Sequence, residues 1–327
     1  RFKTSLSGIL DRILQKNALQ VRLLGTGDTR SGRQLVATRE AVKDHGNRGD
    51  HHVRLISLAA LLAILAPMQG IATTSNAWSN IPAPSDGEAE SIGGYANGCL
   101  NGGEALPAEG RGYQVVRLSR NRYYGHPALI DFIQDLGNRV ADKNLGLMLV
   151  ADMNQPRGGP MPSGHSSHQS GLDADIWLPL DYKRIDGKRD HLKSVAMADR
   201  HKFTMNYDAW SDRQGELIRL AAEDPRVARI FLNPRIKMEL CNMEWEDRRW
   251  LRKIRPWFKH HSHFHVRLKC PQGNAACKNQ APPPAGDGCG KELAEWHPDK
   301  RKLWKKSSGK KSRPPLPQQC NQVLSRK

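Results

Sequence analysis

The sequence lacks an apolar run long enough to cross a bilayer. Its clear apolar run, Leu55–Ala66, has twelve apolar or small residues behind Arg54, whereas a membrane-spanning helix needs about 20. A run of this length is typical of the core of a secretory signal, and Ser75-Asn-Ala77 offers a small-x-small cleavage site. We therefore predict a signal peptide over residues 55–77, behind a non-native or wrongly assigned extension over residues 1–54. The alternative for the apolar run is a buried helix.

Two zinc-associated motifs are also absent. No Cys-x2-Cys occurs among the six cysteines, which disfavours a structural zinc site made of cysteine. An even number of cysteines behind an export signal favours disulfides instead, although the sequence alone does not fix their pairing. No His-Glu-x-x-His occurs either, so the glutamate base that this motif supplies is unsupported.

Positive charge is abundant but does not select a partner. The formal net charge is +18, and nucleic acid is the first partner that such a charge suggests. Residues 1–77 hold 11 Lys and Arg against 5 Asp and Glu, which leaves 40 against 28, or +12, for the rest. A basic protein would also suit the anionic bacterial wall. The charge alone therefore leaves nucleic acid and wall polymer open.

Histidine is concentrated in two short stretches, the first of which is Met161–Trp177. A loop of Gly and Pro leads into it, and a strand over residues 173–178 is predicted to leave it. Side chains alternate between the faces of a strand, so two of its aspartates should share one face. Four candidate site residues lie here: His165, His168, Asp173 and Asp175.

The second stretch, His260–Val266, is predicted to be a strand that places His261, His263 and His265 on one face. A lone His-x-His is a weak signal, because ordinary surface strands and tags also produce it. Two imidazoles and one carboxylate drawn from separate stretches, however, are a ligand set for a catalytic zinc, which keeps one position for water. We therefore predict a metal site built across both stretches.

Ser163–Trp177 and Trp257–Pro271 together resemble the penicillin-insensitive murein endopeptidases. These belong with the lysostaphin-like and D-Ala-D-Ala carboxypeptidase-like zinc peptidases, marked by His-x6-Asp and a later His-x-His. The resemblance runs from about Ser91 to Cys320 and includes Tyr123–Pro127. It implies a periplasmic zinc endopeptidase that hydrolyses D-alanyl–meso-diaminopimelyl crosslinks of peptidoglycan. Neither nucleic acid nor a membrane span in the mature protein is expected.

The resemblance also implies a role for each site residue. The ligands of one catalytic Zn²⁺ per chain map onto His168, Asp175 and His265, with His165 as a further ligand or a substrate-side residue. His263 is expected to handle a proton or stabilise charge. His260 and Trp257 are expected to line the cleft. Relatives carry a second metal between the subunits of a homodimer, and its nearest match here is Asp199 with His201.

The predicted fold class is α+β: a single compact domain over residues 78–320 with a small, mainly antiparallel sheet, followed by a tail over residues 321–327. The chain between Trp78 and Asn101 is expected to be an extended entry segment, and the chain beyond Cys270 to be loop. The resemblance suggests the disulfides Cys99–Cys320, Cys241–Cys289 and Cys270–Cys277. Strands are predicted over residues 113–118, 145–150, 173–178, 227–232 and 263–268, and helices from residue 127 and over residues 215–223 and 244–254.

Two alternatives stay open. A basic nucleic-acid- or wall-binding protein could use the histidines for a structural metal, which would take four protein ligands and leave no reactive water. A related D,D-carboxypeptidase would use the same chemistry on another bond, since bond choice depends on the shape of the cleft. Zinc-dependent hydrolysis of crosslinked muropeptides, with identified products, separates the three.

Overall fold

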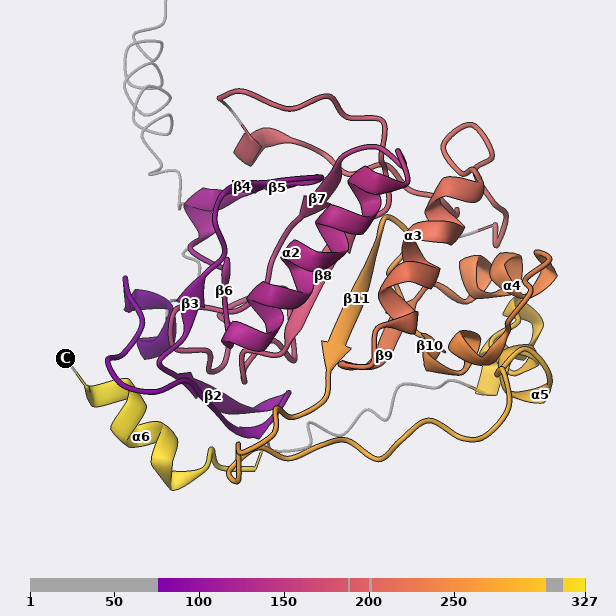
Figure 1. Ribbon diagram of the computed structural model, residues 1–327. Helices are drawn as coiled ribbons and strands as arrows, with labels where there is room; N and C mark the ends of the chain where they lie inside the picture. The colour runs from indigo at the N-terminus through magenta and orange to yellow at the C-terminus, as the bar shows by residue number, and fades with distance from the viewer. Residues whose placement is uncertain (1–75, 188, 200–201, 304–313, 327) are drawn as a thin grey trace, which may run out of the picture. The chain divides into compact units, whose positions relative to one another are not determined.

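The computed structural model in Figure 1 describes residues 76–187, 189–199, 202–303 and 314–326. The predicted extension over residues 1–54 and all but two residues of the predicted signal peptide lie outside these ranges. A short 3₁₀ helix, η1 (Ala77–Asn80), opens the described chain, and its Trp78 is buried. The other described residues fold around one mixed sheet.

Seven strands form that central sheet. Four of its strand pairs are antiparallel and two, β10 with β9 and β5 with β7, are parallel. The mainly antiparallel sheet of the α+β prediction is thus confirmed. In their order across the sheet the strands are β10 (Ile254–Pro256), β9 (Val227–Leu232), β11 (His263–Leu268), β8 (Asp173–Trp177), β7 (Met148–Val150), β5 (Tyr113–Val115) and β4 (Glu109–Gly110).

Helices α2 (Pro127–Asp142) and α3 (Asp212–Glu223) lie side by side over one face of this sheet (Figure 1). Proline fits the first turn of α2, where a backbone N–H has no partner in the helix, and the His126 side chain accepts from Ala128 N–H. The apolar face of α2, which includes Leu129, Ile133, Leu136 and Val140, is buried. Capping by Ser211 makes α3 begin earlier than predicted.

The predicted helix over residues 244–254 is wrong. A helix instead occupies α4 (Pro234–Asn242), which starts with a proline behind the cap residue Asn233. Trp245 donates its indole N–H to the Leu240 carbonyl at the end of α4, so the chain turns back there. The predicted segment holds only the 3₁₀ helix η4 (Arg249–Lys253) and the start of β10.

The ends of the described chain are more ordered than expected. The entry segment forms the hairpin β1 (Glu90–Gly94) and β2 (Asn97–Asn101), and the chain beyond Cys270 ends in helix α6 (Gln318–Ser325). Helix α6 thus continues past residue 320. The remaining elements are β3 (Glu104–Ala105), η2 (Leu118–Arg120), β6 (Tyr124–Gly125), η3 (Arg189–His191), α5 (Lys291–Ala294) and η5 (Pro298–Leu303).

Three disulfides close these ends onto the domain. Cys99–Cys320 joins β2 to α6, Cys241–Cys289 joins α4 to the chain before α5, and Cys270–Cys277 closes a short loop after β11. The pairing suggested by the resemblance is confirmed. None of the helices in the described part of the chain combines the length and apolar character that crossing a membrane requires.

Candidate active site

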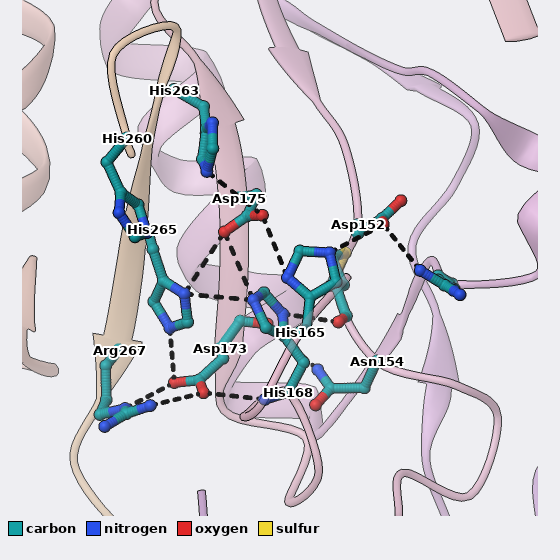
Figure 2. A network of polar contacts seen from close by, with 12 residues as sticks. Asp152, Asn154, His165, His168, Asp173, Asp175, His260, His263, His265 and Arg267 are labelled. Carbon is teal, nitrogen blue, oxygen red and sulfur yellow. Dashed lines mark hydrogen bonds and ion pairs between the residues drawn. The ribbon is translucent and has the colours of Figure 1, made fainter. Parts of the chain in front are cut away.

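The candidate site lies on the sheet face opposite α2 and α3, where β8 and β11 run side by side (Figure 2). Their register pairs Asp175 with His265. Alternation along both strands sends Ala174, Ile176, Phe264 and Val266 into the core under the helices, and the residues between them to the other face. On that face stand Asp173, Asp175 and Trp177 of β8 and His263, His265 and Arg267 of β11.

Three donor atoms on this face form a nearly equilateral triangle. Nε2 of His168 lies 3.1 Å from Nδ1 of His265, and Oδ1 of Asp175 lies 3.3 Å from the first and 3.4 Å from the second. A tetrahedral zinc with bonds of about 2.0–2.1 Å holds its ligand atoms about 3.3–3.4 Å apart. All three side chains are buried. The triangle therefore has the size that a zinc ion requires.

The proton positions in this triangle also suit a cation. Nδ1 of His168 lies 2.7 Å from the Met153 carbonyl, which only an N–H can satisfy, so its Nε2 carries the lone pair. Nε2 of His265 lies 3.3 Å from Asp173, which likewise favours the lone pair on Nδ1. Within the described residues, Oδ1 of Asp175 accepts no hydrogen bond although it is buried. Three acceptors that face one another fit a metal ion.

The charges around the triangle favour a cation beside Asp175. Burial opposes a charge on His168, yet the neighbouring Asp175 raises its pKa overall. Burial lowers the pKa of His265 to about 4. Burial by itself would raise the pKa of Asp175, but the surrounding histidines lower it well below its usual range. The carboxyl is therefore ionised, and positive charge beside it is favourable.

Asp173 and Arg267 hold the triangle from below (Figure 2). Arg267 donates to both oxygens of Asp173 at 2.8 and 2.9 Å, and the backbone N–H of His168 donates to the same carboxylate at 3.1 Å. Burial would raise the pKa of Asp173, but Arg267 and His265 lower it well below its usual range. Asp173 was predicted as a candidate site residue. Arg267 was not predicted, although it follows His265 by two residues on the same strand.

His165 lies at the edge of the triangle. Its Nε2 is 2.9 Å from Oδ2 of Asp152, and its Nδ1 is 3.6 Å from Oδ2 of Asp175. The ligand atoms of His165, His168 and Asp175 all lie within 4.8 Å of one another, so this set could also hold a metal. The triangle with His265 is tighter. Sequence reasoning missed Asp152, because it stands in a loop that carries no motif.

His263 and His260 stand together above Asp175. Nε2 of His263 is 3.6 Å from Oδ2 of Asp175, and the two imidazole centroids are 4.9 Å apart. Burial lowers the pKa of His263 and lowers that of His260 to about 3. Both rings are therefore neutral at neutral pH. A neutral imidazole beside the triangle can accept a proton.

Trp257 and the predicted second metal site lie farther out. Trp257 is 50% exposed and packs on Phe231, whose ring in turn contacts that of His265. The carboxylate of Asp199 accepts the backbone N–H of Lys202 at 2.8 Å. His201 lies outside the described residues, so the second metal site stays a prediction.

A cleft of about 720 Å³ opens over the triangle. Asp175, His165 and His263 line it on the side of the triangle, and Trp177 continues the same strand face. Ser79 and Asn80 of η1 border it as well. One corner of the triangle, Asp175, thus reaches the cleft. A structural metal site, by contrast, is usually closed by a fourth protein ligand.

A two-histidine, one-carboxylate triangle at the floor of an open cleft, carried on an α+β sheet, is typical of metal-dependent hydrolases. The comparison with known families agrees with this class. The model of the penicillin-insensitive murein endopeptidases matches residues 91–325, and the chain belongs to that family. The resemblance found in the two histidine stretches is thereby confirmed.

Individual relatives match nearly their whole length. The chain is 47% identical over 272 residues to the penicillin-insensitive murein endopeptidase of Klebsiella pneumoniae, covering 82% of this chain and 97% of that protein. It is 48% identical over 252 residues to that of Haemophilus influenzae, covering 76% and 88%. The enzyme of Escherichia coli K12 is 44% identical over 270 residues, covering 81% and 96%.

Proposed function

We propose that the protein is a periplasmic zinc-dependent murein endopeptidase that hydrolyses D-alanyl–meso-diaminopimelyl crosslinks in peptidoglycan. One observation carries the proposal: three acceptor atoms lie 3.1–3.4 Å apart at the floor of a cleft in a chain of this family. The periplasmic location rests on the signal peptide predicted from the sequence, and a homodimer stays a prediction.

His168, Asp175 and His265 would hold one zinc ion per chain. Held there, the ion would supply Lewis-acid chemistry: it would lower the pKa of a water molecule towards neutrality and polarise the amide carbonyl of a crosslink. Met153 and Asp173 hold the two imidazoles so that unprotonated nitrogens face the ion, and Arg267 holds Asp173. Groups behind a ligand that fix its orientation in this way raise metal affinity.

His263 would move the proton during hydrolysis. It is neutral because burial lowers its pKa, it lines the cleft, and its Nε2 lies close to Asp175. Nε2 can take the proton that the attacking water gives up and pass it to the departing amine. His260 packs on the His263 ring and fixes its position. His165, held by Asp152, would border the site on the substrate side.

Purified sacculi test the proposal directly. We expect crosslinked dimers to be converted to monomers, with activity lost in a chelator and restored by zinc. His297→Ala is a suitable control variant, since His297 is half-exposed and pairs with Asp299 away from the cleft. Release of terminal D-alanine from monomers without loss of dimers would instead identify a D,D-carboxypeptidase. Stoichiometric zinc with no hydrolysis of either kind would favour the binding protein with a structural metal.

A further inference from the structure

One wall of the cleft carries three arginines from the segment after β5. Arg117 precedes η2, Arg120 ends it, and Arg122 follows, and all three line the cleft. Arg120 lies 3.2 and 3.0 Å from the two oxygens of Asp152, and Arg122 lies 3.0 Å from one of them. These two guanidinium groups are therefore used within the protein, where they hold the carboxylate that supports His165.

Arg117 is held differently. Within the described residues, no hydrogen bond or ion pair involves its guanidinium; instead Cζ lies 5.1 Å from the centre of the Trp177 ring. Its backbone has φ 60° and ψ 40°, the left-handed region that a side chain other than glycine seldom adopts. Such strain is retained where the surrounding structure needs the residue in that place. Its guanidinium thus lines the cleft without a hydrogen bond or close ion pair among the described residues, although the carboxylates of Asp152 and Asp175 in the same cleft attract it.

The position of Arg117 relative to the metal triangle follows from strand geometry. Trp177 lies two residues beyond Asp175 on β8, so the two side chains leave the same face about 7 Å apart. Arg117, which lies over the Trp177 ring, therefore borders the same cleft as Asp175 of the metal triangle. A guanidinium that covers a ring with its face keeps its N–H edges available, and these edges match the two oxygens of a carboxylate.

We propose that Arg117 binds the free carboxylate that flanks the scissile amide on its amine side. In a D-alanyl–meso-diaminopimelyl crosslink, the carbon that bears the scissile nitrogen also bears a free carboxylate. The inference rests on the proposed function, since it assigns a substrate contact to the same cleft. Arg117 is a residue of substrate specificity, and it takes no part in the bond-breaking step.

A pair of substrates tests this contact. One is a purified crosslinked muropeptide dimer with the free carboxylate, and the other is the same dimer with that carboxylate converted to a carboxamide. For the wild type we expect kcat/KM to be about 10- to 100-fold lower on the carboxamide, because a charge-assisted, two-point hydrogen bond is lost. Arg117→Gln should lose a similar factor on the carboxylate substrate, mainly through KM, and little on the carboxamide.

Two further variants separate recognition from support of the fold. Arg117→Lys keeps the charge and should restore part of the loss. Arg111→Gln removes the same charge from an exposed pair with Asp142 outside the cleft and should leave both substrates unaffected. Zinc content and thermal unfolding of each variant show whether it is folded.

Each remaining outcome overturns the inference. If Arg117→Gln slows both substrates equally, Arg117 only supports Trp177 and the cleft wall. If the wild type hydrolyses both dimers equally well, the carboxylate is not recognised, while the proposed endopeptidase function stands. If the wild type hydrolyses neither dimer, the proposed function itself fails and this inference with it. The comparison of wild-type rates needs no variant, so a variant that does not fold leaves the test intact.

Discussion

The two faces of the β8–β11 pair share one backbone but differ in polarity and charge. One face presents Ala174, Ile176, Phe264 and Val266, all fully buried against the core under the helices. The other presents carboxylates, imidazoles and a guanidinium whose neighbouring N and O atoms lie 2.8–3.6 Å apart. Packing of the first face fixes the backbone, and that backbone sets the distances between the polar groups. Stability and chemistry should therefore be separable by residue even though they alternate along one strand.

The largest expected effect is loss of the metal site. His265→Ala removes one corner of the triangle, so zinc content and crosslink hydrolysis should fall together to background. The free energy of unfolding of the zinc-free protein should change little by comparison. Metal analysis and muropeptide digestion measure the effect, with His297→Ala as the control. Retention of stoichiometric zinc by His265→Ala would place the metal on the alternative set with His165.

His263 lies on the same face but should behave differently. Because it is outside the triangle, His263→Ala should keep zinc near stoichiometric, while turnover slows by about 10²–10⁴-fold through loss of proton transfer and charge stabilisation. The same two assays measure this variant. A loss of zinc comparable to that of His265→Ala contradicts the division of roles between the two histidines.

On the apolar face the effect should fall on folding. Phe264→Ala should lower the free energy of unfolding by about 3–5 kcal/mol, because Phe264 is fully buried and its removal leaves a cavity. The zinc affinity of the molecules that remain folded should change little. Denaturant unfolding of the zinc-free protein measures the loss, with the half-exposed Phe258→Ala as the matched control. Equal losses in both variants would show that the face beneath the helices does not carry the stability.

The smallest effect is expected behind the metal ligands. Arg267→Lys keeps the charge but loses the two-point hold on Asp173, so His265 is less firmly oriented. Zinc affinity should fall by about 10- to 100-fold, with folding largely retained. Competition with a zinc chelator measures the zinc affinity. Arg111→Lys is the control for replacing an arginine by a lysine. Unchanged affinity would mean that Asp173 orients His265 without help from Arg267.

Local pattern alone determined much of this protein. Local pattern was enough to predict β8, β9 and β11 as strands. For β8 and β11 it also predicted which side chains share a face, because the period of a strand is set by the backbone. The His-x6-Asp and His-x-His spacings indicated the family and predicted a metal site. The predicted helix over residues 244–254 was wrong: α4 ends at Asn242, and the local hydrogen bond from the Trp245 indole to the Leu240 carbonyl turns the chain back there.

Only the tertiary structure decided which distant groups meet. His168 and His265 are 97 residues apart, and their contact depends on the register of β8 against β11. The Met153 carbonyl, Asp152 and Arg117 reach the site from segments without a motif, brought there by the order β11-β8-β7-β5 across the sheet. Short sequence patterns encode which face a residue occupies. The neighbours on that face are set by strand pairing, which follows from burying the apolar face under α2 and α3.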